Sequence, residues 1–93
     1  MGTEPFKRIA IVTGATSGIG QAAARKLIES GMAVVGSGRN REKLETLAAE
    51  LGEAFAWAAG DAADDRVIDQ LFAAAEDTFG RPADIVVVNA GRG

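Results

Sequence analysis

The chain has 93 residues, of which 47% are hydrophobic and 25% charged, and its formal net charge is −3. This composition is ordinary for a folded domain and excludes a disordered or fibrous chain. The negative charge predicts no general attraction to nucleic acid or to anionic membranes. Because cysteine and histidine are both absent, disulfides and thiolate catalysis are excluded, and a metal would have only carboxylates as ligands.

Short apolar runs alternate with helical patterns along the chain. The first run, Ile9–Val12, is too short for a signal peptide or a membrane span, so we expect a cytoplasmic protein. Glycines and the capping residues Asn40 and Asp64 mark the ends of the elements. The predicted strands are 8–13, 33–37, 54–58 and 85–88, and the predicted helices begin at Ile19, after Asn40 and after Asp64.

Each predicted helix has an apolar face. The first should present Ile19, Ala23 and Leu27 to the core, because these residues recur every four positions. The other helices should use two further sets with the same kind of spacing. These are Leu44, Leu47 and Leu51 in the second helix, and Ile68, Phe72, Ala75 and Phe79 in the third.

The βαβαβαβ order predicts an α/β fold, a Rossmann-type doubly wound parallel sheet with strand order 3-2-1-4. In that order the strand at 85–88 lies at an edge, although its residues are apolar on both faces. We therefore expect a second chain segment to cover it. The interpretation is that residues 1–93 are a piece of a longer protein, or that they pair with another chain.

A glycine-rich turn separates the first strand from the first helix. Gly14 permits a tight exit from the strand, Gly18 lets a phosphate approach the backbone, and Gly20 allows the helix to pack closely on the sheet. Thr16 and Ser17 add hydroxyl groups at the same place. Free N–H groups and the helix dipole favour a pyrophosphate there, and the absence of a P-loop lysine argues against an NTPase.

The end of the second strand indicates which dinucleotide is bound. NAD-preferring Rossmann sites usually place an acidic residue about 20 residues beyond the glycines, where this chain has Gly38. Ser37 and Arg39 flank that glycine, and a guanidinium can pair with a 2′-phosphate. NADP is therefore favoured, with NAD as the alternative. In the other interpretation, Arg39 and Arg41 are only solvated charges at the start of the second helix.

Three motifs in order resemble the cofactor half of the short-chain dehydrogenase/reductase family. They are Thr-Gly-Ala-Thr-Ser-Gly-Ile-Gly at 13–20, Asp61 after the third strand, and Asn-Ala-Gly at 89–91. Val88 stands where the family often has another asparagine. The resemblance implies that the turn from Gly14 to Gly20, including Ile19, holds the pyrophosphate. It further implies that Asp61 and Ala62 border the adenine, and that Asn89, Ala90 and Gly91 line the cofactor near its riboses. Taken alone, Asp61 and the 89–91 triplet would be ordinary turn residues.

The resemblance also implies an activity, namely hydride transfer between nicotinamide and a small carbonyl or alcohol substrate, in an enzyme expected to be a homo-oligomer. The family uses a serine and a Tyr-x-x-x-Lys pair for that step, whereas this chain contains no tyrosine. By this resemblance, residues 1–93 are the N-terminal part of a single NAD(P)-binding Rossmann domain whose catalytic C-terminal part is absent. The 93 residues alone are therefore expected to be inactive, and no catalytic residue is assigned. Two alternatives stay open: a dinucleotide-binding module without turnover, and a methyltransferase-like site for S-adenosylmethionine, which the arginine at 39 disfavours.

Overall fold

The computed structural model describes residue 6 and residues 8–89, which form one βαβαβαβ chain. Strands and helices alternate from end to end, and one short 3₁₀ helix precedes the third strand. The elements are β1 (Ile9–Val12), α1 (Gly18–Glu29), β2 (Ala33–Gly38), α2 (Arg41–Leu51), η1 (Gly52–Ala54), β3 (Phe55–Ala59), α3 (Asp65–Phe79) and β4 (Ile85–Val87).

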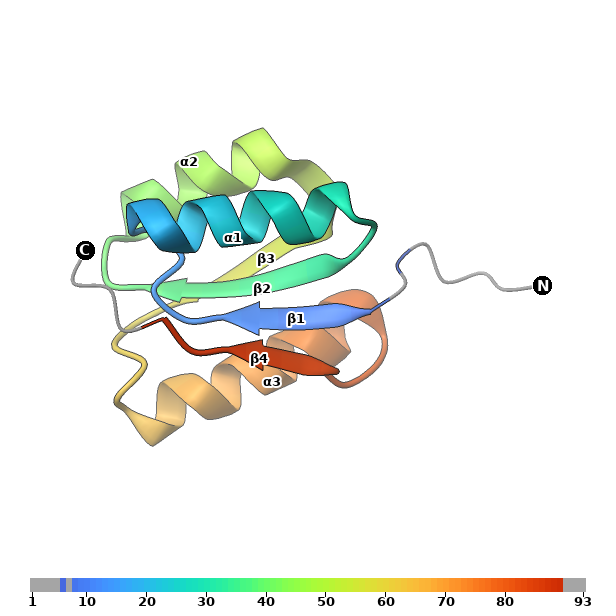
Figure 1. The fold of residues 1–93 in the computed structure, drawn as a ribbon. Coiled ribbons are helices and arrows are strands. Elements are labelled where there is room, and N and C mark those ends of the chain that lie inside the picture. The colour runs from blue at the N-terminus through green and yellow to red at the C-terminus, as the bar shows by residue number, and fades with distance from the viewer. Residues whose placement is uncertain (1–5, 7, 90–93) are drawn as a thin grey trace.

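The four strands form a parallel sheet in the order β3-β2-β1-β4, as predicted. Ile9 of β1 pairs with Ala33 of β2, and Ala10 pairs with Ile85 of β4. Helices α1 and α2 cover one face of the sheet and α3 covers the other (Figure 1). This is the Rossmann-type doubly wound arrangement, in which a parallel sheet is buried between helices.

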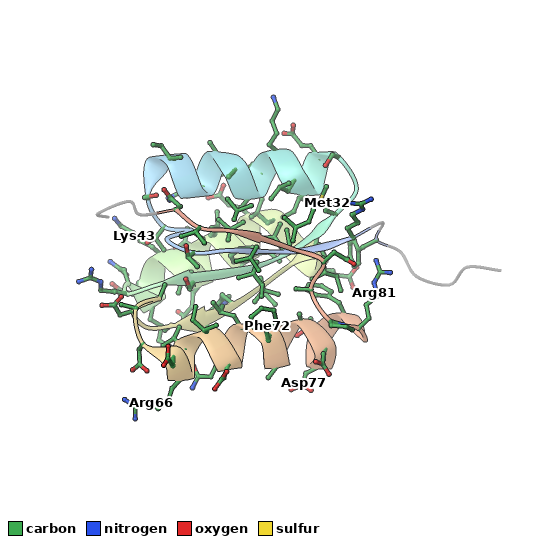
Figure 2. All side chains as sticks on the ribbon, turned by 60° about the horizontal axis from the view of Figure 1, so that its bottom comes forward. Met32, Lys43, Arg66, Phe72, Asp77 and Arg81 are labelled. Carbon is green, nitrogen blue, oxygen red and sulfur yellow. The ribbon has the colours of Figure 1, made fainter. Side chains whose placement is uncertain are left out.

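Side chains fill the space between the sheet and the helices on both sides (Figure 2). On one side, Ile11 of β1 packs in a cluster with Leu71 of α3. On the other side, Val12 and Val34 pack in a cluster with Leu44 of α2. The central strands are therefore buried on both faces, which explains the apolar run of β1 and the Ala-Val-Val start of β2.

The buried face of α1 differs from the predicted one. The residues that α1 buries are Gly20 and Ala24, whereas Ile19 is 75% exposed and Ala23 and Leu27 are half-buried. Small residues face the sheet because the start of the helix lies against the preceding turn too closely for a larger side chain. The predicted stripe of larger residues was therefore wrong by one position.

The third helix shows a similar rotation. Its buried residues are Val67, Leu71 and Ala75, while Phe72 is 39% exposed. Phe72 lies on the same helix face as Ile68, which is partly buried against the core. Of the predicted stripe, Ala75 is buried in the core and Ile68 and Phe79 pack against it, so the prediction was wrong for Phe72 and missed Val67 and Leu71. By contrast, the second helix buries Leu44 and Leu47 as predicted.

The strand at the outer edge, β4, leaves apolar side chains exposed. Val86 is 47% exposed and Val88, just beyond the strand, is 78% exposed. Among the described residues β4 pairs only with β1, so its other edge has no partner strand. In the same part of the chain, no helix is long and apolar enough to cross a membrane.

Helix α3 begins with the predicted cap, Asp64, and this residue gives a pH-dependent prediction. Its carboxylate pairs with the Arg66 guanidinium at 3.1 Å and accepts a hydrogen bond from the Arg66 backbone N–H at 2.9 Å. These bonds lower the pKa of Asp64 below its ordinary value of 3.8. A lowered pKa means that the charged cap stabilises the folded state above that ordinary value, and that this contribution is lost as the pH falls through the folded-state pKa.

We expect Asp64→Asn to cause a small decrease in Tm at neutral pH, because asparagine keeps the capping oxygen but removes the charge. At an acidic pH, where the wild-type carboxyl is increasingly protonated too, the difference between the two melting temperatures should be smaller. Thermal unfolding followed by circular dichroism at both pH values tests this. An equal difference in Tm at the two pH values would contradict the prediction.

Candidate cofactor-binding site

A pocket of about 760 Å³ lies at the carboxyl ends of the strands. This is the edge at which open α/β sheets bind ligands, beside the point where the strand order reverses. The volume is in the range of small-molecule and cofactor sites. Its lining residues are Thr13, Gly14, Thr16, Ser17, Ser37, Gly38, Arg39, Asn40, Lys43, Gly60, Asp61, Ala62, Ala63, Val88 and Asn89.

The turn after β1 is tied to the end of β2. Gly14 has a φ of 64°, a left-handed conformation that glycine adopts without strain. Its N–H lies 3.4 Å from the Ser37 hydroxyl oxygen, and the N–H of Ala15 donates to the Ser37 carbonyl at 2.7 Å. The Ser37 side chain is almost fully buried. Ser37 therefore acts on the turn itself and helps to fix its shape.

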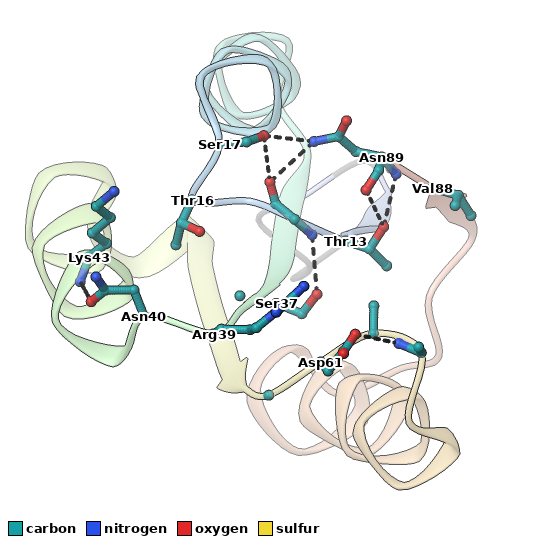
Figure 3. Close-up of a pocket in the computed structure, with 15 residues that line it drawn as sticks. Thr13, Thr16, Ser17, Ser37, Arg39, Asn40, Lys43, Asp61, Val88 and Asn89 are labelled. Atoms are coloured by element: carbon teal, nitrogen blue, oxygen red, sulfur yellow. Dashed lines mark hydrogen bonds between the residues drawn. The ribbon is translucent and has the colours of Figure 1, made fainter. Parts of the chain in front are cut away.

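Ser17 and Asn89 hold the other side of the turn (Figure 3). The Ser17 hydroxyl donates to the Gly14 carbonyl at 2.9 Å, and its oxygen accepts the Gly20 N–H at 3.0 Å as the N-cap of α1. The Asn89 side-chain amide donates to the Ser17 hydroxyl at 2.8 Å and to the Gly14 carbonyl at 3.2 Å. Because Ser17 has a single hydroxyl hydrogen, its donor capacity is committed within the protein.

The two glycines at the start of α1 have different surroundings. A Cβ placed on Gly20 would lie 2.0 Å from the Gly14 carbonyl oxygen, so only glycine allows this close approach of helix and turn. A Cβ placed on Gly18 would meet no atom within 4 Å, and Gly18 is exposed. Within residues 6 and 8–89 the N–H groups of Gly18 and Ile19 have no acceptor, whereas the Gly20 N–H bonds to Ser17. Such free N–H groups are typical of an anion site.

Two cations stand on the side of the pocket away from Asn89. Arg39 follows the end of β2, and Lys43 lies in the first turn of α2 (Figure 3). Both residues are exposed. The neighbouring Arg41 does not line the pocket; its guanidinium lies 5.3 Å from the ring centre of Trp57 and near Glu45. Arg39 therefore lines the pocket, whereas Arg41 lies outside it.

Asp61 lies after β3 on the opposite wall. One of its carboxylate oxygens accepts the Ala63 N–H at 2.9 Å, and its carbonyl accepts the Asp64 N–H at 2.9 Å. Asp61 therefore forms the turn before α3 and also lines the pocket together with Ala62. It is the one carboxylate among the pocket-lining residues that the structure describes.

The structure brings most of the predicted site residues together. Eight of them line the pocket: Gly14, Thr16, Ser17, Ser37, Arg39, Asp61, Ala62 and Asn89. Gly18, Ile19 and Gly20 lie beside it at the start of α1 but are not among its lining residues. Ala90 and Gly91 lie outside the described residues.

The sequence did not single out several further lining residues, above all Lys43 and Thr13. Lys43 lies in the first turn of α2, and its place on the pocket depends on how that helix packs on the sheet, which no local pattern indicates. Thr13 is buried, and its hydroxyl oxygen accepts the Asn89 backbone N–H at 2.9 Å. The pocket thus offers hydrogen-bond donors and cations for an anionic ligand. In residues 6 and 8–89 there is no group of three histidine, cysteine, aspartate or glutamate side chains that could hold a metal.

Comparison with known proteins agrees with this geometry. Serine 3-dehydrogenase of Agrobacterium fabrum is 51% identical over 81 residues, which are 87% of this chain and 32% of that protein. A 3-ketoacyl-(acyl-carrier-protein) reductase from Brucella melitensis, solved with NADH, has a TM-score of 0.78 and 32% identity over 87% of this chain and 33% of its own. A closed serine dehydrogenase complexed with NADP⁺ has a TM-score of 0.64 and 37% identity over 70% of this chain and 26% of its own.

The chain spans about a third of the length of the curated relative described above. The model of the short chain dehydrogenase family matches residues 8–93, which include every element of the fold and all the pocket-lining residues. The chain therefore belongs to the short-chain dehydrogenase/reductase family of oxidoreductases.

Proposed function

We propose that this chain is the cofactor-binding part of an NADP(H)-dependent oxidoreductase that transfers hydride between nicotinamide and a small carbonyl or alcohol substrate. The observation that carries the proposal is the pocket at one edge of the sheet. The glycine turn that leads into α1 lines one side of it, and Arg39, just after β2, also lines it. The named relative serine 3-dehydrogenase is matched over 32% of its length, so we propose the reaction class and not that substrate.

The glycine turn supplies the pyrophosphate site in this proposal. The N–H groups of Gly18 and Ile19 open the helix, and the helix dipole adds partial positive charge there. Ser17, Asn89 and Ser37 hold the turn by their own hydrogen bonds, so the binding donors are backbone groups fixed before the ligand arrives. Fixed donors reduce the entropy that binding costs.

Arg39 supplies the preference for NADP. The end of β2 carries Gly38 in place of an acidic residue, so no carboxylate at that position repels a 2′-phosphate. Arg39 and Lys43 both line the pocket, and neither forms an ion pair with another described residue. Two cations that are not neutralised by neighbours suit a dianionic phosphate group.

Substituting Arg39 tests the cofactor preference. We expect Arg39→Gln in the full-length gene product to weaken NADP⁺ binding by about 10- to 100-fold, the usual worth of a hydrogen bond to a charged group, and to leave NAD⁺ binding nearly unchanged. Isothermal titration calorimetry with both dinucleotides measures this. Arg41→Gln is the matched control, because Arg41 lies against Trp57 and not on the pocket. Equal losses for the two dinucleotides would contradict the assignment.

The two glycines of α1 give a second test. Gly18→Ala should leave Tm unchanged or slightly raised, because the added Cβ meets no atom and alanine favours a helix. The same change should weaken both dinucleotides at least about tenfold, by placing a methyl group where the pyrophosphate approaches. Gly20→Ala should instead lower Tm steeply, because its Cβ would collide with the Gly14 carbonyl. Thermal unfolding and calorimetry on the two variants distinguish the binding glycine from the packing glycine.

We also infer that another segment of the complete protein covers β4. The exposed valines, Val86 and Val88, lie at the open edge of the sheet, and bare apolar strand edges recruit other chains. The curated relative described above is about three times as long as the matched region, so it has chain enough for such a cover.

Val86→Lys distinguishes a covered strand from an open one. In the 93-residue chain the lysine should reduce self-association, because a charged edge strand resists pairing with copies of itself. In the full-length protein the same lysine should be destabilising by several kcal/mol, because its charge would be buried without a partner. Light scattering of the short chain and chemical unfolding of the long one provide the two measurements. An unchanged stability of the full-length variant would show that β4 stays uncovered.

A further inference from the structure

Gly38, at the end of β2, has no room for a side chain because of Thr16. A Cβ built on Gly38 would lie 2.8 Å from Thr16 Cγ2, 2.9 Å from Thr16 Oγ1 and 3.4 Å from Thr16 Cβ. Carbon atoms in contact normally lie about 3.5–4.0 Å apart. Thr16 belongs to the glycine turn and Gly38 to the sheet, so this contact joins the two halves of the pocket.

The backbone on both sides of this contact is held in place. Gly38 pairs with Ala59 of β3, and its carbonyl accepts the Gly60 N–H at 2.8 Å. On the other side, Ala15, the residue before Thr16, donates to the Ser37 carbonyl at 2.7 Å. Neither segment can move away without breaking hydrogen bonds. Relief must therefore come from the Thr16 side chain.

Rotation of Thr16 cannot supply that relief. A threonine has two γ atoms distributed over three staggered positions, and two of these positions point at Gly38, as the 2.8 and 2.9 Å distances show. Whichever rotamer Thr16 adopts, at least one of those two positions is filled. A serine has a single γ atom and can place it in the third position. The obstruction is therefore a property of a β-branched residue at 16.

We propose that Thr16 is a specificity-determining residue, which acts by excluding a side chain from position 38. Position 38 is where NAD-preferring sites carry the carboxylate that binds the ribose hydroxyls. Thr16 leaves no room for a carboxylate side chain at position 38. The space beside Arg39 therefore stays open for a 2′-phosphate. This inference rests on the proposed dinucleotide function for its ligand, but the steric coupling of the two positions does not.

The first measurement is a double-mutant cycle in the full-length gene product, read by chemical unfolding. Gly38→Ala should destabilise the wild-type protein and the Thr16→Val variant to the same extent, because valine keeps both γ atoms. In the Thr16→Ser background the cost should fall by about tenfold in the unfolding equilibrium constant, a coupling typical of residues in contact. Thr16→Val also removes the hydroxyl, so it separates the shape of Thr16 from its hydrogen-bonding capacity.

The second measurement is the ratio of NAD⁺ to NADP⁺ affinity, determined by calorimetry. Gly38→Asp alone should bind both dinucleotides poorly. Thr16→Ser combined with Gly38→Asp should raise the NAD⁺ to NADP⁺ ratio at least about tenfold above that single variant, an effect of the size expected for neighbouring sites.

An equal cost of Gly38→Ala in the threonine, valine and serine backgrounds would overturn the steric coupling. The effects of the two substitutions on stability could be coupled while the ratio of NAD⁺ to NADP⁺ affinity does not change with residue 16. That result would overturn the role of Thr16 in specificity. The wild-type protein could also bind neither dinucleotide while the stability coupling persists. That result would contradict both the proposed function and the role of Thr16 in specificity, but it would leave the steric contact supported.

Discussion

The carbonyl oxygen of Gly14 joins three separate segments of the chain. It accepts hydrogen bonds from the Ser17 hydroxyl at 2.9 Å and from the Asn89 side chain at 3.2 Å, and Gly20 packs against it without a Cβ. Ser17 begins α1, while Asn89 follows β4 at the far end of the chain. A single peptide group thus fixes how β1, α1 and β4 meet beside the pocket. The shape of the pocket wall formed by Thr13, Gly14, Ser17 and Asn89 depends on that meeting point.

The polar side chains near the glycine turn form hydrogen bonds within the protein. The turn or its neighbours are hydrogen-bonded by Ser17, Ser37 and Asn89. Among the described residues, no buried side-chain polar atom lacks a partner. The groups left for an anion are the backbone N–H groups at the helix start and the exposed cations Arg39 and Lys43. Under the proposed function, this division would let a chain with a net charge of −3 hold the phosphate groups of its cofactor locally.

Local signals in the sequence were sufficient for the order and type of the elements. Asn40 and Asp64 cap helices as predicted, because a capping side chain acts on the backbone two or three residues away. The stripe of α1 was displaced by one position, since hydrophobic spacing does not reveal that Gly20 brings its helix so close to the turn. In α3 the stripe was right for Ala75 and wrong for Phe72. Lys43 and the contact of Thr16 with Gly38 depend on segments that are distant in sequence, and no local pattern encodes such distances.

The sheet order also links the stability of β4 to the shape of the pocket. Because β4 pairs with β1, its end brings Asn89 to the turn, where the Asn89 backbone N–H bonds to Thr13 and its side chain bonds to Ser17 and Gly14. Fraying of this exposed three-residue strand would therefore release the turn from one side. Anything that covers the open edge of β4 stabilises these hydrogen bonds as well. If another segment covers β4, as proposed above, this edge strand is the element through which that segment would act on the pocket.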